Sequence, residues 1–155
     1  MPSKERLSAQ ILAALELNHR ELLDLCLVIE ELASSTSEEV QSATCDEVAD
    51  RLLPLLARTQ QLEELALFQQ FETAADSTFG ERFTQELKAE HRCDLAAAAV
   101  AFSELGRIKE DSAAIETARH FLRGFAEALR RHINSEKLII EALISSEAEN
   151  RPIFS

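Results

Sequence analysis

Three histidines and three residues with carboxylate or amide side chains recur in this sequence at spacings that suit a metal ion. Each half of the chain follows one template: a histidine, a second position 41 residues later, and a glutamate four residues beyond it. The second copy follows the first by 72 residues, a regularity not expected of four histidines placed independently. The six candidate metal ligands are His19, Gln60, Glu64, His91, His132 and Glu136.

The spacing of these residues allows several of them to reach one ion. Side chains four residues apart lie on one face of a helix, so His132 and Glu136 can bind together, and Gln60 and Glu64 share that geometry. Each candidate lies midway along a stripe of apolar residues at helical spacing, which should face the core. A buried ionised carboxylate costs several kcal/mol unless it is paired or coordinated, and a cation with neutral imidazoles removes that cost. A metal site is therefore favoured over a set of isolated core histidines.

One candidate and one further histidine depart from the template. Gln60 stands where the second copy has a histidine, and its amide oxygen is a weaker ligand for a transition-metal ion than imidazole. Glu16 or Glu63, each one turn from a candidate ligand, could supply a carboxylate instead, although we expect both to face solvent. His120 lies twelve residues before His132. That separation is about 120° around a helix at about 100° per residue, so we expect His120 at the surface or at a helix interface.

The composition predicts that long helices position these ligands. Of 155 residues, 46% are hydrophobic and only three are Gly and three Pro, which indicates a single all-α domain spanning residues 1–155. We expect an up-down-up-down four-helix bundle with helices over about 4–33, 44–73, 81–105 and 112–147, the second starting alternatively near residue 37. The expected caps are Ser3, Thr44 and Asp111 or Ser112, with a kink or short break at Pro54 and a stop at Gly106.

Charge and cysteine content exclude several classes of partner. The net charge of −12 repels phosphate, so we expect neither nucleic-acid binding nor binding to an anionic membrane. No uncharged run approaches the roughly 18 residues of a membrane span, and charges in the first twenty residues argue against a signal peptide. The cysteines Cys26, Cys45 and Cys93 are odd in number and widely spaced, which favours a reducing, cytoplasmic setting. Cys26 falls on an apolar helical face and should be a core residue.

The segments around the candidate ligands resemble those of the hemerythrin-like HHE cation-binding family. They read LNHRELL, QQLEELALF, KAEHRCDL and LRRHINSEKLII and span nearly the whole chain. The resemblance implies a hemerythrin-like bundle with a non-haem di-iron centre. It also implies a protein that binds, senses or reacts with O₂, peroxide or nitric oxide.

The resemblance further implies a division of the ligands between two irons. On the family pattern His91 and His132 bind one iron, His19 and residue 60 bind the other, and the carboxylates of Glu64 and Glu136 bridge both. Because the family has a second histidine where this chain has an amide, we expect the His91–His132 half to bind metal firmly and the His19 half to be weaker.

Two other hypotheses remain open at this stage. A ferritin-like oxidase needs Glu-x-x-His on two helices, and only Glu16 with His19 fits, because Lys88 and Leu129 lie three residues before the other candidate histidines. The chain also has no Tyr and no Trp to carry a side-chain radical. A helical binding or regulatory module with a degenerate metal site is the third hypothesis, which Gln60 favours. We expect a binding or sensing protein rather than an enzyme, with peroxidase-like or oxidase-like activity at the metal as the alternative.

Overall fold

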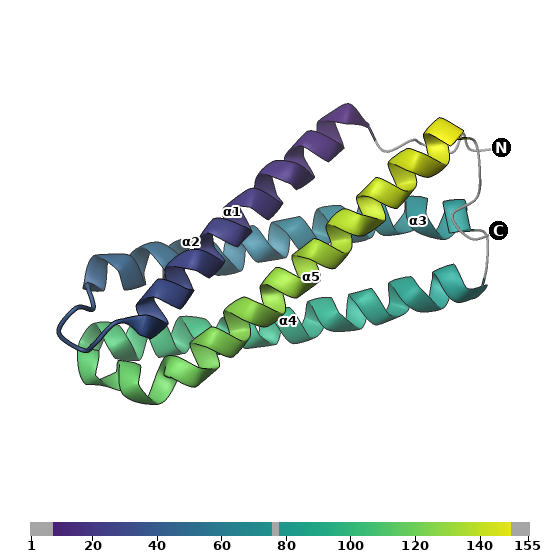
Figure 1. Cartoon of the computed structure of the whole chain (residues 1–155). Helices are drawn as coiled ribbons and strands as arrows, with labels where there is room; N and C mark the ends of the chain where they lie inside the picture. Colours follow the sequence, from purple (N-terminus) through teal and green to yellow (C-terminus); the bar gives the residue numbers. More distant parts are fainter. Residues whose placement is uncertain (1–7, 76–77, 150–155) are drawn as a thin grey trace.

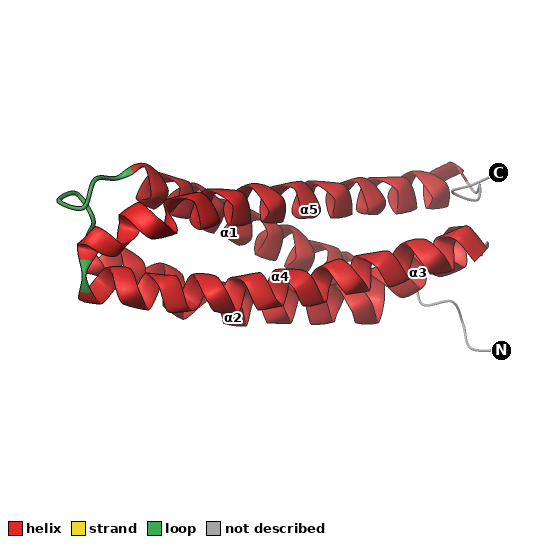
Figure 2. Cartoon of the chain, turned by 90° about the horizontal axis from the view of Figure 1, so that it is seen from below, coloured by secondary structure: helices red, strands yellow, loops and turns green. Residues whose placement is uncertain are grey.

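The computed structural model describes residues 8–75 and 78–149. Its helices form four antiparallel segments (Figure 1). The elements are α1 (Ala9–Ser34), α2 (Ser42–Leu62), the π-helical turn η1 (Glu63–Leu67), α3 (Phe68–Ala75), α4 (Thr78–Glu110), the 3₁₀ turn η2 (Ser112–Ala114) and α5 (Ile115–Glu149). Because η1 joins α2 to α3 without a loop, these three elements form one segment. α1 lies along α5, and α2 lies along α4 (Figure 2). The predicted all-α, up-down-up-down four-helix bundle is confirmed.

Side chains cap both ends of α1 with hydrogen bonds. At the N-terminus, Ser8 Oγ accepts an N–H of the first turn at 3.1 Å. The predicted cap Ser3 lies outside the described residues. At the C-terminus, Arg119 of α5 donates from Nε to the Ala33 carbonyl at 2.7 Å and from Nη2 to the Ser35 carbonyl at 2.9 Å. These bonds satisfy carbonyls that a helix end leaves without partners, and they tie α1 to α5.

Two residues predicted to interrupt helices lie inside them. Gly106 was expected to end its helix, but α4 continues to Glu110. Leu105 and Ile108, on either side of it, are both buried, and their packing outweighs the roughly 1 kcal/mol that glycine costs relative to alanine in a helix. α2 likewise continues through Pro54, so there is no break at that residue.

α1 begins at Ala9, about five residues after its predicted start, and, apart from the end of α4, the remaining helix boundaries lie within three residues of their predicted positions. α2 begins at Ser42, two residues before the predicted cap, and α4 begins at Thr78, three residues before the predicted start. Asp111 is a cap, as predicted, because its side chain accepts the backbone N–H two residues on at 3.1 Å. Residues 76–77 of the predicted loop lie outside the described part of the chain.

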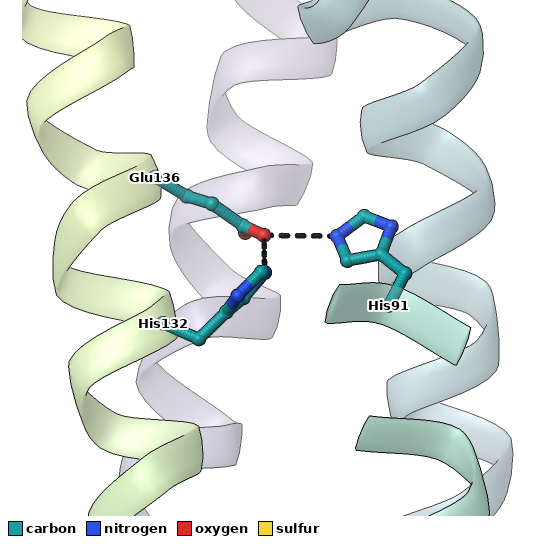
Figure 3. A group of neighbouring side chains, drawn as sticks. All are labelled: His91, His132 and Glu136. Carbon is teal, nitrogen blue, oxygen red and sulfur yellow. Dashed lines mark hydrogen bonds and ion pairs between the residues drawn. The ribbon is translucent and has the colours of Figure 1, made fainter. Parts of the chain in front are cut away.

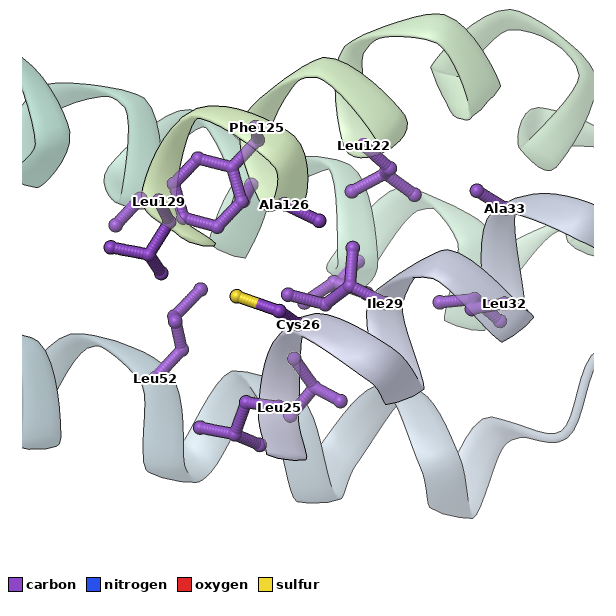
Figure 4. Close-up of a cluster of buried hydrophobic side chains, with 14 of the residues drawn as sticks. Leu25, Cys26, Ile29, Leu32, Ala33, Leu52, Leu122, Phe125, Ala126 and Leu129 are labelled. Carbon is purple, nitrogen blue, oxygen red and sulfur yellow. The ribbon is translucent and has the colours of Figure 1, made fainter. Parts of the chain in front are cut away.

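Two apolar clusters fill the bundle, one on each side of its middle. The larger, toward the 35–41 loop, includes Leu25, Cys26, Ile29, Leu52, Leu122 and Leu129 (Figure 4). Cys26 is a core residue, as predicted, and burial raises the pKa of its thiol to about 12. The smaller cluster includes Leu15, Leu67, Phe68, Leu87 and Ile139. Within residues 8–75 and 78–149, none of the helices has the apolar stretch that crossing a bilayer requires.

Truncating the larger cluster should destabilise the bundle. Leu25 is 1% exposed, so Leu25→Ala should lower the free energy of unfolding by about 2–5 kcal/mol, through lost burial and the cavity left behind. Leu27, two residues along α1, is 53% exposed, and Leu27→Ala is the matched control with an expected change within about 0.5 kcal/mol. Urea denaturation of both variants measures the difference. Equal losses would contradict this assignment of the core.

Candidate metal centre

A layer of buried polar side chains separates the two apolar clusters. On α1, for example, His19 lies between Leu15 of the smaller cluster and Leu22 of the larger. The fully buried polar residues of this layer are His19, Gln60, Glu63, His91 and Glu136. Because apolar packing excludes water on both sides, charges in this layer interact more strongly than they would at the surface.

One group of candidate ligands joins α4 to α5. His91 Nε2 lies 2.9 Å from Glu136 Oε1, and His132 Nε2 contacts the same oxygen (Figure 3). The three residues each bring one potential ligand atom, and these atoms all lie within 4.8 Å of one another. The four-residue spacing of His132 and Glu136 puts both side chains on the inward face of α5.

A second group joins α1 to the α2–η1 segment and shares Glu136 with the first. His19 Nε2 lies 3.3 Å from Glu136 Oε2 and 3.7 Å from Glu63 Oε1. The other oxygen of Glu63, Oε2, lies 3.8 Å from His91 Nε2. Glu136 and Glu63 therefore each present one oxygen to His19 and the other to His91. Carboxylates placed in this way could each bind two neighbouring cations.

Glu63, and not Glu64, carries the inward carboxylate of this segment. Glu63 is 2% exposed, whereas the Glu64 side chain is 37% exposed and lies with Oε2 3.6 Å from the outer nitrogen of His91, Nδ1. The prediction that Glu63 faces solvent is wrong, and Glu64 is not among the residues that converge. At about 100° per residue, Glu63 lies about 20° around the helix from the buried Leu52, and Glu64 about 120°. The 72-residue repeat pointed to Glu64, but the apolar stripe of the same helix contained the signal for Glu63.

The π-helical turn η1 begins at this carboxylate. The N–H of Phe68 donates to the carbonyl of Glu63, five residues earlier, where an α-helix would span four. The extra residue rotates the helix that follows, so that Leu67 and Phe68 are both buried. Phe68 then stacks on the His91 ring with centroids 5.1 Å apart and planes 27° apart. Such turns are frequent at functional sites, and this one seats an aromatic ring beside a candidate ligand.

The remaining sequence candidates have different surroundings. Gln60 is buried, and its Nε2 donates to the backbone carbonyl of His91 at 3.0 Å, which leaves the amide oxygen as its only potential metal donor. Glu16 is exposed on the outside of α1, as predicted. His120 is also exposed, again as predicted.

The side chains of this layer contact one another as ion pairs but do not complete one another's hydrogen bonds. His19 Nε2, Glu63 Oε2 and His132 Nε2 each lie near a neighbouring ligand candidate, yet none of them has a hydrogen bond of good geometry to a described residue. Burial raises the pKa of the Glu63 carboxyl, although His19 partly offsets the shift. Burial and the neighbouring His132 lower the pKa of His91 to about 3, so its ring is neutral at physiological pH. Neutral imidazoles and carboxylates that share a dry site are a donor set that fits divalent or trivalent metal ions.

A sequence model of the hemerythrin HHE cation-binding domain matches residues 10–144. The chain belongs to this family. The match extends over parts of all four helical segments and includes every residue of the polar layer. Searches of curated proteins and of solved structures returned no match. The residues that converge in this HHE domain therefore have a cation-binding family as their context.

Exchanging the two neighbouring glutamates separately should distinguish their roles in the HHE domain. Glu63→Gln removes the inward carboxylate, and we expect it to weaken ferrous-ion binding by more than the roughly 10- to 100-fold typical of losing an outer partner of a ligand. Glu64→Gln, one residue away, should weaken binding less. Anaerobic metal titration measures both, and circular dichroism checks that each variant is helical. A larger loss of affinity in Glu64→Gln than in Glu63→Gln would show that Glu64 is the metal ligand.

Proposed function

We propose that this HHE domain holds a pair of non-haem iron ions. The observation that carries the proposal is the position of Glu136, which has one oxygen beside His91 and His132 and the other beside His19. Glu63 parallels it, with one oxygen toward each of two helices. Two groups of ligands that share a carboxylate suit two ions better than one.

The donor set favours iron among the cations that the family could bind. Imidazole nitrogens suit iron, zinc and copper, whereas a site for magnesium or calcium would be built from oxygen donors alone. The likeness of the ligand segments to the hemerythrin pattern supports iron in particular. When bound, such a pair of irons supplies reversible binding of, or electron transfer to, O₂, peroxide or nitric oxide. We propose one of these small molecules as the ligand.

The chain's own residues would bind the ions, hold the ligand side chains in place and exclude water from the site. His91 is packed against the Phe68 ring, which restricts its rotation. Leu15, Leu67 and Leu87 are buried beside the layer and keep bulk water from the carboxylates. We assign a binding or sensing role rather than a catalytic one, in keeping with the cation-binding description of the family. The three cysteines are free thiols, which supports a reducing, cytoplasmic setting.

The wild-type chain should bind ferrous iron and gain stability from it. A ligand that binds only the folded state at 100 times its dissociation constant adds about 2.7 kcal/mol to the free energy of unfolding. We therefore expect a rise in melting temperature on anaerobic addition of ferrous iron, and near-ultraviolet absorption of a ferric pair after air is admitted. Glu136→Ala, which removes the shared carboxylate, should lose most of both signals. A wild-type chain that binds no iron and shows no shift would identify the domain as a helical module that has lost its metal.

Replacing the amide of Gln60 by an imidazole should strengthen iron binding in the half of the centre that contains His19. Gln60→His supplies an imidazole at a buried position beside His91, and we expect the second of the two proposed ions to bind more tightly, so that more iron is retained per chain after dialysis. Gln61→His is the matched control, because residue 61 is exposed and its imidazole would face solvent. Metal analysis of the dialysed proteins gives the count. An iron content that is the same in all three proteins would show that residue 60 does not limit the second ion.

A further inference from the structure

His132 is held by side chains on both of its ring nitrogens. Nε2 faces Glu136 in the polar layer. On the opposite edge of the ring, Nδ1 lies 2.8 Å from Glu90 Oε2 and 3.7 Å from Asp94 Oδ2. Glu90 precedes His91 in the chain, yet its carboxylate reaches across to the histidine of the neighbouring helix.

The other two histidines of the layer have no such hydrogen bond. The outer nitrogen of His91, Nδ1, lies 3.6 Å from Glu64 Oε2, which is beyond hydrogen-bond length, and His19 Nδ1 has no hydrogen-bond partner among the described residues. Among the three histidines, the outer hydrogen bond to a carboxylate of α4 is therefore specific to His132.

The contact with Glu90 requires a hydrogen on Nδ1 of His132, because an ionised carboxylate only accepts hydrogen bonds. Nε2 faces Glu136, a second acceptor. With its hydrogen on Nδ1, a neutral imidazole has its lone pair on Nε2, where it can bind a cation placed between the ring and Glu136. Outer carboxylates that bind a ligating histidine in this way fix its orientation and make it a stronger donor.

The position of the pair suits this role. The His132 side chain is 8% exposed, whereas Glu90 is 59% exposed and can keep its negative charge at little cost in hydration. Glu90, Asp94 and His132 line a surface pocket of about 330 Å³ between α4 and α5. The charge thus stays in contact with solvent while the hydrogen bond acts on a buried ring.

We propose that Glu90 is a positioning residue that holds the hydrogen of His132 on Nδ1, with the Asp94 carboxylate beside it as electrostatic support, and so directs Nε2 to the first metal ion to bind. This inference rests on the proposed metal-binding function. It makes the His91–His132–Glu136 group the half that loads first, for a reason independent of Gln60. The carboxylates act through His132 and do not themselves contact the ion.

The test uses the full chain with two readouts, one of which needs no metal. Long-range ¹⁵N NMR of the metal-free protein at pH 8 reports which ring nitrogen of His132 carries the hydrogen. We expect Nδ1–H in the wild type and a shift toward Nε2–H in the double variant Glu90→Ala/Asp94→Asn, which removes both carboxylates. Titration with zinc, a diamagnetic probe of the same site, should show binding to the first site weakened about 10- to 100-fold in the double variant.

Two further variants separate positioning from a general effect of charge. Glu90→Gln keeps an oxygen that can accept the hydrogen, so it should preserve the Nδ1–H form and weaken zinc binding less than Glu90→Ala. Glu86→Ala removes an exposed carboxylate one turn earlier on α4 and should change neither readout. An unchanged His132 tautomer and unchanged zinc affinity in the double variant would overturn the proposal. Failure of the wild type to bind zinc or iron would instead count against the metal centre, and the NMR result would still test the hydrogen bond.

Discussion

Two carboxylates buried in an apolar interior are the constraint on which this structure depends. Glu63 and Glu136 lie in a layer from which the packed clusters exclude water, where an unpaired charge would cost several kcal/mol. Neither residue has a lysine or arginine beside it within the described contacts; their neighbours in the layer are histidines. The helices therefore had to converge in a register that brings imidazoles from α1, α4 and α5 to these carboxylates. The π-helical turn and the contacts of His132 are local adjustments to that requirement.

Much of this arrangement could be predicted from the sequence, because it depends on composition and periodicity. Scarce glycine and proline indicate a helical bundle, and the 72-residue repeat identifies His19, His91, His132 and Glu136. The repeat pointed to Glu64, whereas the buried carboxylate is that of Glu63. The two copies differ here in which residues face inward, and the π-helical turn begins at Glu63. Gly106 does not end its helix, because the low helix propensity of glycine is outweighed by the packing of the buried residues around it. The Glu90–His132 contact could not be predicted, because it joins different helices through an exposed side chain that no apolar pattern marks.

The two copies of the repeat interlock rather than forming separate halves. Each copy contributes two neighbouring helical segments, yet α1 lies along α5 and α2 lies along α4, so the most extensive packing crosses between copies. The layer has the same character, because Glu63 of the first copy faces His91 of the second, and Glu136 of the second faces His19 of the first. Neither half could complete the layer by itself. The two copies of the internal repeat thus contribute to one polar layer, in which their residues are not equivalent.

The height of this layer in the bundle affects how long a bound ion would stay. An ion held by α1, the α2–η1 segment, α4 and α5 would cross-link four stretches of chain that are far apart in sequence, as a disulfide does for two. Helix ends open readily, but the layer lies between two packed clusters, several turns from any end. Fraying of a terminus would leave every ligand in place. Release of the ion would then depend on movements of the ligand side chains in the middle of the bundle, and not on opening of the helix ends.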